Sequence, residues 1–165
     1  RVIGEADAAE RLRGEMEREI LQYRQSPPVR RPRVYFEEWG DPLICGIGWV
    51  SDLIEAAGGE DLFRERAASP AASGRVVDPE EVVEKDPEII FASWCGKRVS
   101  FDRLRARPGW EGIGAVREGN LVEIKAPYIL QPGPSILRGL RRMHEVIGEY
   151  AKEQCSGIEG RGRIN

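Results

Sequence analysis

The sequence predicts an α/β fold: a three-layer αβα lobe with a mainly parallel, Rossmann-like sheet, preceded by one long bridging helix. Three strand-like apolar runs support this prediction, near residues 33–37, 88–92 and 120–124. Segments with helical periodicity lie between them, so strands and helices alternate along the chain. Strands connected in this way run parallel, and helices cover both faces of their sheet.

The length and composition limit the class of protein. The chain has 165 residues, enough for one domain or one lobe of a larger protein. It has no apolar stretch near the roughly 20 residues that a membrane span needs. Its net charge of −3, with both signs mixed along the chain, does not indicate a nucleic-acid partner. The three cysteines have no C-x-x-C spacing, so we expect neither a zinc site nor a disulfide framework.

The first element is predicted over residues 5–24, within a bridging-helix segment of residues 1–26. Its apolar residues recur at steps of three and four among charged ones, which is typical of an amphipathic helix; they are Ala9, Leu12, Met16, Ile20 and Tyr23. Pro27 and Pro28 end this helix and begin a stiff connector to the first strand.

The α/β ligand-binding lobe is expected over residues 27–153. Gly58 and Gly59 are typical of a helix end, and Asp78 followed by Pro79 is typical of a helix start. The last helix should bury one stripe of apolar residues: Ile136, Leu137, Leu140, Met143 and Ile147. The expected order is strand 33–37, helix 47–58, an irregular stretch around 67–74, helix 78–85, strand 88–92, helix 100–106, strand 120–124 and helix 134–152.

Residues 154–165 are predicted to form a disordered tail. Gly157, Gly160 and Gly162 lie there among charged residues, without an apolar period. Residues 158–161 read Ile-Glu-Gly-Arg, a recognition sequence of a protease used to remove expression tags. We therefore expect that this tail is not natural.

Aromatic residues follow each of the three predicted strands: Trp39, Trp94 and Tyr128. The carboxyl ends of parallel strands meet at one rim of a sheet, where such folds bind ligands. Aromatic side chains supply contact area at little conformational cost, so we expect a crevice for a large, planar, partly polar ligand. The alternative is that the tryptophans only cap the core. The candidate ligand-binding residues are Glu38, Trp39, Trp49, Trp94, Lys97, Arg98, Tyr128 and Gln131.

Evidence for catalysis is weak. Cys45 near a helix start and Cys95 beside basic residues stand where thiol pKa values tend to fall, so either could be a nucleophile or a soft metal ligand. His144 is the only histidine and lies far along the sequence, so a Cys–His pair is poorly supported, and small-residue packing is the favoured role for both thiols. The Gly-x-Gly at residues 46–48 lacks the third glycine of a dinucleotide loop. We therefore expect no catalytic residues and no metal site.

Four segments together resemble a known family. They read RVYFEEWGDPLI at 33–44, WVSDLIEAAGGEDLF at 49–63, DPEIIF at 86–91 and QPGPSILRGL at 131–140. The sequence resembles the C-terminal lobe of the ABC-transporter substrate-binding proteins for vitamin B12, ferric siderophores and haem. This resemblance covers about residues 2–150.

The resemblance implies a receptor of two α/β lobes joined by one rigid helix, with the ligand between the lobes. Helix 5–24 resembles that bridge, and an N-terminal lobe would precede Arg1, so this chain would be half of a receptor. The implied location is periplasmic or extracytoplasmic, although the first residues show no signal-peptide pattern. The implied partners are a metal chelate and the membrane permease of an ABC importer.

Within the family, the cobalamin receptors are the most similar group. Tyr128 stands where such receptors set an aromatic residue against the corrin ring, and Trp39 lies in another contributing loop. Lys97, Arg98 and Gln131 would then make polar contacts to the side groups of the chelate, which is a ligand and not a cofactor. Cobalamin, haem and a ferric siderophore remain open as ligands.

Two alternatives belong to other functional classes. One is an enzyme that uses the thiol of Cys45 or Cys95. The other is a stand-alone lobe that acts as a protein-interaction or oligomerisation module, with a second copy covering the surface that the absent lobe would cover.

Overall fold

The structure, a computed structural model, describes the backbone of residues 5–161 and the side chains of residues 5–156. Its helices are α1 (Ala6–Gln25), α2 (Gly48–Ala57), α3 (Arg64–Ala67), α4 (Pro79–Lys85), α5 (Phe101–Arg105), α6 (Gly114–Glu118) and α7 (Ile136–Arg161). The strands are β1 (Arg33–Gly40), β2 (Leu43–Cys45), β3 (Glu60–Asp61), β4 (Ile89–Ala92) and β5 (Leu121–Glu123). Short 3₁₀ helices are η1 (Ala72–Arg75), η2 (Trp110–Gly112) and η3 (Ala126–Tyr128).

The sheet is mainly parallel, as the sequence predicts. Its strand order is β2-β1-β4-β5, and β3 pairs with the start of β1. Strands β1, β4 and β5 run parallel, with Glu37 opposite Ala92 and Ala92 opposite Glu123. Only β2 is antiparallel, because it returns from β1 in a tight hairpin. The three parallel strands therefore bring their carboxyl ends to one edge of the sheet.

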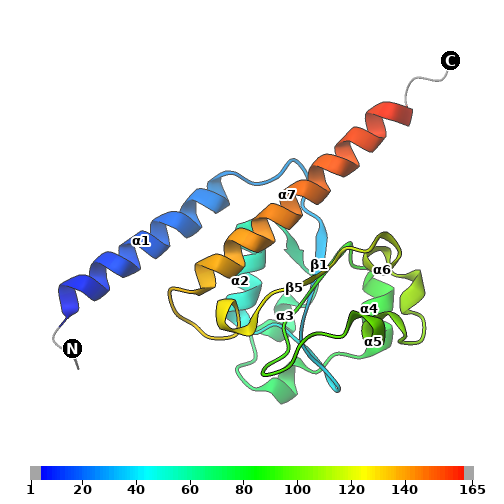
Figure 1. Cartoon of the computed structure of the whole chain (residues 1–165), viewed down its shortest axis with the longest axis horizontal. Coiled ribbons are helices and arrows are strands. Elements are labelled where there is room, and N and C mark those ends of the chain that lie inside the picture. Colours follow the sequence, from blue (N-terminus) through cyan, green and yellow to red (C-terminus); the bar gives the residue numbers. More distant parts are fainter. Residues whose placement is uncertain (1–4, 162–165) are drawn as a thin grey trace.

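Two hydrophobic clusters fill the two sides of this sheet. Successive side chains of a strand point to opposite faces, and β1 and β4 follow this rule. Val34 and Phe36 pack with α2 and α7, whereas Tyr35 packs with residues from α4, α5 and η2. Figure 1 shows α2 and α7 on one side of the sheet and α4 to α6 on the other. The predicted three-layer architecture is thus confirmed.

Helix α7 packs through the predicted stripe and is longer than predicted. Leu140, Met143 and Ile147 are fully buried, and Ile136 and Leu137 pack against the same cluster. The helix extends to Arg161, beyond the predicted end at 152 and into the predicted tail of residues 154–165, of which residues 162–165 lie outside the described part. Once packing has nucleated a helix, each further residue adds a backbone hydrogen bond at small cost, which explains this extension.

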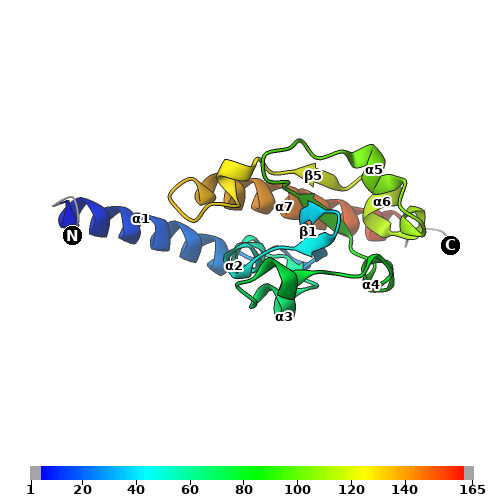
Figure 2. The ribbon, with the colours of Figure 1, turned by 90° about the horizontal axis from the view of Figure 1, so that it is seen from below.

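Helix α1 contacts the lobe only through its second half. Ile20 and Tyr23 pack on the core, but Leu12 of the predicted apolar stripe is 42% exposed. Glu19 points toward α7 and accepts hydrogen bonds from Arg141 at 2.6 and 2.8 Å. Figures 1 and 2 show the first half of α1 projecting away from the lobe.

Four short strands or α-helices were not expected from the sequence: β2, β3, α3 and α6. None exceeds five residues, which is too short for a periodic pattern to show. The predicted caps are present: Gly58 ends α2 with φ of 96°, and the Asp78 carboxylate accepts from the Glu80 amide at 2.9 Å.

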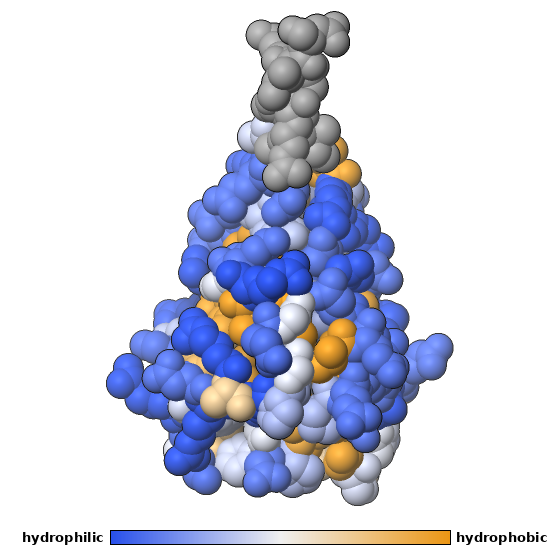
Figure 3. Space-filling view, turned by 90° about the vertical axis from the view of Figure 1, so that its right-hand side faces the viewer, coloured by the Kyte–Doolittle hydropathy of each residue, from blue (hydrophilic) through white to orange (hydrophobic). Residues whose placement is uncertain are grey.

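The outer surface of the lobe is largely polar. Figure 3 views the molecule from the right-hand side of Figure 1, and apolar residues form only small separate patches there. Within residues 5–161, no helix combines the length and the apolar character that crossing a membrane would require.

Two glycines of α7 allow a matched test of how the η3 segment packs. A Cβ atom on Gly139 would lie 2.3 Å from the carbonyl oxygen of Tyr128, whereas a Cβ atom on Gly148 meets nothing within 4 Å. We expect Gly139→Ala to lower the free energy of unfolding by about 1–3 kcal/mol, because backbone atoms must move apart. Gly148→Ala should raise it by up to about 1 kcal/mol through helix propensity. Urea unfolding measures both, and equal effects would contradict the close packing at Gly139.

Candidate functional site

The end of β1 with the hairpin turn after it, and the loop that follows β4, enclose a hollow at the carboxyl edge of the sheet. Trp39 lies within β1, opposite Ile44 of β2, and not after the strand as the sequence predicts. The parallel pairing of these strands brings Trp39 and Trp94 to the same place. The hollow has a volume of about 360 Å³, and α5 with the segment after it closes one side. Its lining residues are Trp39, Gly40, Asp41, Trp94, Lys97, Arg103 and Arg107. Of the three aromatics that the sequence places after strands, Trp39 and Trp94 line this hollow and Tyr128 does not.

The Trp94 indole is held by a buried carboxylate beneath the hollow. Its Nε1 donates to Glu37 Oε1 at 3.0 Å, and Glu37 is fully buried on β1. Arg107 donates to both Glu37 oxygens, at 2.5 and 3.0 Å, and to the carbonyl oxygen of Gly40 at 3.2 Å. The guanidinium also lies over the Trp110 ring, 4.4 Å from its centre. This set of contacts fixes both Trp94 and Arg107.

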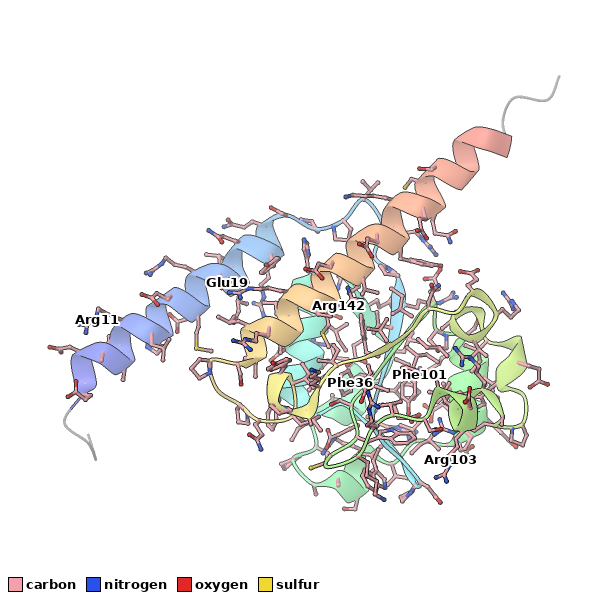
Figure 4. All side chains as sticks on the ribbon, in the orientation of Figure 1. Arg11, Glu19, Phe36, Phe101, Arg103 and Arg142 are labelled. Atoms are coloured by element: carbon pink, nitrogen blue, oxygen red, sulfur yellow. The ribbon has the colours of Figure 1, made fainter. Side chains whose placement is uncertain are left out.

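Trp39 forms the opposite wall together with Lys97. The Lys97 Nζ atom lies 4.8 Å from the centre of the Trp39 ring, within the range of a cation–π interaction. The Trp39 Nε1 donates to the carbonyl oxygen of Asp41 at 2.8 Å. Arg103 completes the lining from α5, and Figure 4 shows it near the end of β1.

Trp49 and Tyr128 belong to a second group and do not line this hollow. Trp49 Nε1 donates to the carbonyl oxygen of Ile129 at 3.0 Å, so the start of α2 is tied to the segment after β5. The Tyr128 hydroxyl accepts from Arg138 at 3.1 Å, and that guanidinium lies 5.2 Å from the ring centre. Both aromatics are half-buried against the core between α2 and α7.

The other predicted site residues have different surroundings. The Glu38 carboxylate accepts hydrogen bonds from Arg75 at 2.6 and 3.0 Å. Arg75 is 3% exposed and also donates to the carbonyl oxygen of Cys45, so this pair joins η1 to the β1–β2 hairpin. Arg98 and Gln131 are exposed and outside the hollow.

Sequence reasoning missed Arg103 and Arg107. A usable indication existed, because a carboxylate at Glu37 within an apolar strand must be buried and needs a cationic partner. Nothing in the sequence shows which of the 25 basic residues provides it. The partner is Arg107, which lies 70 positions from Glu37 in the sequence and reaches it only in the folded chain.

The reactive-thiol interpretation of Cys45 is corrected by its burial. Cys45 is 1% exposed, and removal from water raises the pKa of its thiol to about 12. At neutral pH the group is therefore a protonated, inaccessible thiol that packs in the core. Cys95 is exposed in the loop after β4. The side chains described here include no cluster of three or more His, Cys, Asp or Glu residues that could hold a metal ion.

Comparisons with known proteins identify relatives of this chain. A "Cobalamin-binding protein" of Halobacterium salinarum is 28% identical over 155 residues, covering 87% of this chain and 40% of its own length. A "Vitamin B12-binding protein" of Vibrio parahaemolyticus is 28% identical over 137 residues, covering 81% and 46% respectively. The chain thus spans less than half the length of these relatives.

Solved structures share the fold. The periplasmic haem-binding protein RhuT from Roseiflexus sp. RS-1 matches with a TM-score of 0.75 at 22% identity, covering 91% of this chain and 59% of that one. The periplasmic vitamin B12-binding protein BtuF of Vibrio cholerae matches with a TM-score of 0.63 at 21% identity, covering 88% and 54%. The family model described as "Periplasmic binding protein" matches residues 1–128. The chain belongs to the periplasmic binding protein family.

Proposed function

We propose that this chain is the ligand-binding lobe of an ABC-importer solute-binding protein located outside the cytoplasmic membrane. It binds a metal chelate, a corrinoid such as vitamin B12, and presents it to a membrane permease. The observation that carries this proposal is the hollow between Trp39 and Trp94, where two indoles from neighbouring parallel strands flank a preformed space. Relatives that are named for binding cobalamin or vitamin B12 support the choice of ligand.

The aromatic walls suit a flat, partly polar ligand. Two indole rings offer a large apolar contact area and lose few rotatable bonds on binding. The cations beside them provide polar contacts for substituents on the edge of such a ring. Ligand sites combine apolar contact area with a few fixed polar groups, and this hollow sets two indoles beside four charged side chains.

The Trp94 side of the hollow is held in place by buried hydrogen bonds. Glu37 accepts from Trp94 and Arg107 at once, so the indole cannot turn without breaking a buried hydrogen bond. Gly40 allows the close approach, because a Cβ atom there would lie 2.7 Å from Trp94 Cζ2. A preformed site loses little conformational freedom on binding, which lowers the cost of holding a ligand there.

The thiol-enzyme alternative loses one of its two candidates. Cys45 is buried with a protonated thiol, and Cys95 is not part of the hollow lining. A cysteine nucleophile is commonly activated by a base within hydrogen-bonding reach. The ring nitrogen Nδ1 of His144 lies 3.1 Å from the carbonyl oxygen of Ala57, in the contact between α7 and α2.

Tryptophan fluorescence tests chelate binding directly. We expect cyanocobalamin or haemin to quench the emission of Trp39 and Trp94 in a saturable manner, because both chelates absorb light and would lie against these rings. N-acetyltryptophanamide at the same absorbance provides the control for inner-filter effects. If cyanocobalamin, haemin and a ferric siderophore all fail to produce saturable quenching, the proposal is wrong.

Glu37→Gln tests the support beneath the hollow. This change leaves the Arg107 guanidinium without its buried counter-charge, so we expect the free energy of unfolding to fall by about 3 kcal/mol. Glu84→Gln on the exposed side of α4 is the control and should change it by less than about 0.5 kcal/mol. Urea denaturation measures both variants. Similar small effects would show that the Glu37–Arg107 pair contributes little to stability.

Gly40→Ala tests whether the position of Trp94 matters for binding. The added methyl group must displace the indole, so we expect chelate affinity to fall by roughly tenfold, equivalent to about 1.4 kcal/mol. Gly112→Ala adds a methyl group where nothing lies within 4 Å and should leave the affinity unchanged. Isothermal titration calorimetry compares the variants. Unchanged affinity in Gly40→Ala would exclude Trp94 as a binding wall.

A further inference from the structure

A second hollow, the α7 groove, lies between the connector after α1 and the C-terminal half of α7. Residues 27–29 form one wall, and the other wall includes Gly148, Ala151 and Cys155. The connector leads into β1, and Figure 1 shows it beside α7 at the start of that strand. Trp39 is near the far end of β1, so the α7 groove and the hollow between the tryptophans are at opposite edges of the sheet.

The α7 groove has a volume of about 450 Å³, within the range of roughly 300–1,000 Å³ that small-molecule sites have. Val29 at its edge is 94% exposed, and a Cβ atom on Gly148 would meet nothing within 4 Å. His144 and Cys155 both line it and are eleven positions apart, roughly 16 Å along the helix. Ten residues line it, fewer than the roughly 20–30 that each side of a standard protein interface contributes. The shape therefore favours a small elongated ligand over a protein partner.

The charge of the α7 groove is positive. None of the described side chains that line it is a carboxylate, although the chain has 28 acidic residues. Lys152 lines it, is exposed, and forms no ion pair with a carboxylate of residues 5–156.

His144, which also lines the α7 groove, adds no negative charge. Its Nδ1 atom lies 3.1 Å from the carbonyl oxygen of Ala57. A carbonyl oxygen only accepts, so Nδ1 carries a proton and Nε2 is the basic nitrogen. The ring is therefore neutral or positive, and the groove offers apolar walls with a cationic group at its mouth.

We propose that the α7 groove binds a small anionic amphiphile, a molecule with one aliphatic chain and one carboxylate, such as a medium-chain fatty acid. The chain lies along the apolar wall that includes Gly148 and Ala151, where each buried methylene group adds to the affinity. The carboxylate remains at the mouth of the groove beside the ammonium of Lys152. This site is separate from the chelate hollow and does not rest on the proposed function.

Three amphiphiles with the same aliphatic chain test the proposed ligand class. Decanoate, decyl glucoside and decyltrimethylammonium are titrated into the 165-residue chain by isothermal titration calorimetry, each below its critical micelle concentration. We expect decanoate to bind saturably and most tightly, the neutral glucoside more weakly, and the cation most weakly. No saturable binding of decanoate, or equal affinity for the cation, would overturn the proposal.

Gly148→Leu tests whether the aliphatic chain occupies the α7 groove. The leucine side chain fills the open space over this position, and leucine favours a helix more than glycine does, so the variant should fold. We expect it to weaken decanoate binding at least about tenfold, because the ligand loses most of its apolar contact. Gly14→Leu, at an interior helical glycine of α1 outside the groove, is the matched control and should leave the affinity unchanged. Decanoate binding that Gly148→Leu does not weaken would overturn the proposal.

Lys152→Gln tests the contact with the carboxylate. We expect it to weaken decanoate binding by about two- to fivefold, as for one exposed ion pair, and to leave decyl glucoside binding unchanged. Lys85→Gln on α4, outside the α7 groove, is the control and should change neither affinity. Equal weakening of both ligands by Lys152→Gln would contradict a role in binding the carboxylate.

Two thiols locate the bound ligand. Cys155 is half-buried in the wall of the α7 groove, whereas Cys95 is exposed in the loop after β4. With most of the chains occupied, decanoate should slow alkylation of Cys155 by iodoacetamide by roughly threefold or more and leave Cys95 unaffected. Mass spectrometry of the labelled peptides measures both rates. Unchanged alkylation of Cys155, or equal slowing at both thiols, would overturn the proposed site.

A second copy of the chain is the competing occupant of the α7 groove. We expect light scattering to show the same mass for the wild type and Gly148→Leu, because the groove holds a small molecule. A wild-type dimer that Gly148→Leu dissociates and Gly14→Leu does not would show that the groove is an interface between copies, and would overturn the proposal. Chelate quenching of tryptophan fluorescence should be the same with and without decanoate, so the two sites are tested separately.

Discussion

The buried carboxylate of Glu37 is the constraint on which the rim of this lobe depends. It lies on β1, the strand that pairs with β2, β3 and β4, and it has no contact with solvent. A charge in that position is tolerated only with close compensation. Arg107 provides the opposite charge and Trp94 provides a neutral donor, so one carboxylate fixes two elements that follow β4. The geometry of the hollow follows from this electrostatic requirement.

The parallel pairing of β1 with β4 places the two tryptophans of the hollow beside the buried Glu37 carboxylate. Glu37 lies opposite Ala92, so the residues that follow each strand emerge side by side. Trp39 comes two positions after Glu37, and Trp94 comes two positions after Ala92. Gly40 leaves room for the indole at the point where a side chain would collide with it. The space above Gly40, the hydrogen bond to Glu37 and the strand register together fix the position of Trp94.

The sequence predicts well the features that depend on local pattern. The alternating elements, the apolar stripe of α7 and the aromatics at the strand ends all follow from periodicity and from the properties of parallel sheets. It predicts poorly what depends on distant partners. Arg75 binds the Glu38 carboxylate, which lies 37 positions earlier in the sequence. Arg75 also donates to the carbonyl oxygen of the buried Cys45, which lies 30 positions earlier. The helical end of α7 was missed because its glycines oppose a helix locally, while its packed first half favours propagation.

Helix α1 and the Trp94 wall are held by separate sets of contacts. Its second half is held by the Glu19–Arg141 pair and by Tyr23, whose ring lies 4.6 Å from that of His144. These contacts join α1 to α7, the helix that also packs on the sheet and on the η3 segment. A change in the angle of α1 would have to break them together. In the proposed function, the Trp94 wall is held by Glu37 independently of α1, and such a preformed wall lowers the conformational cost of binding.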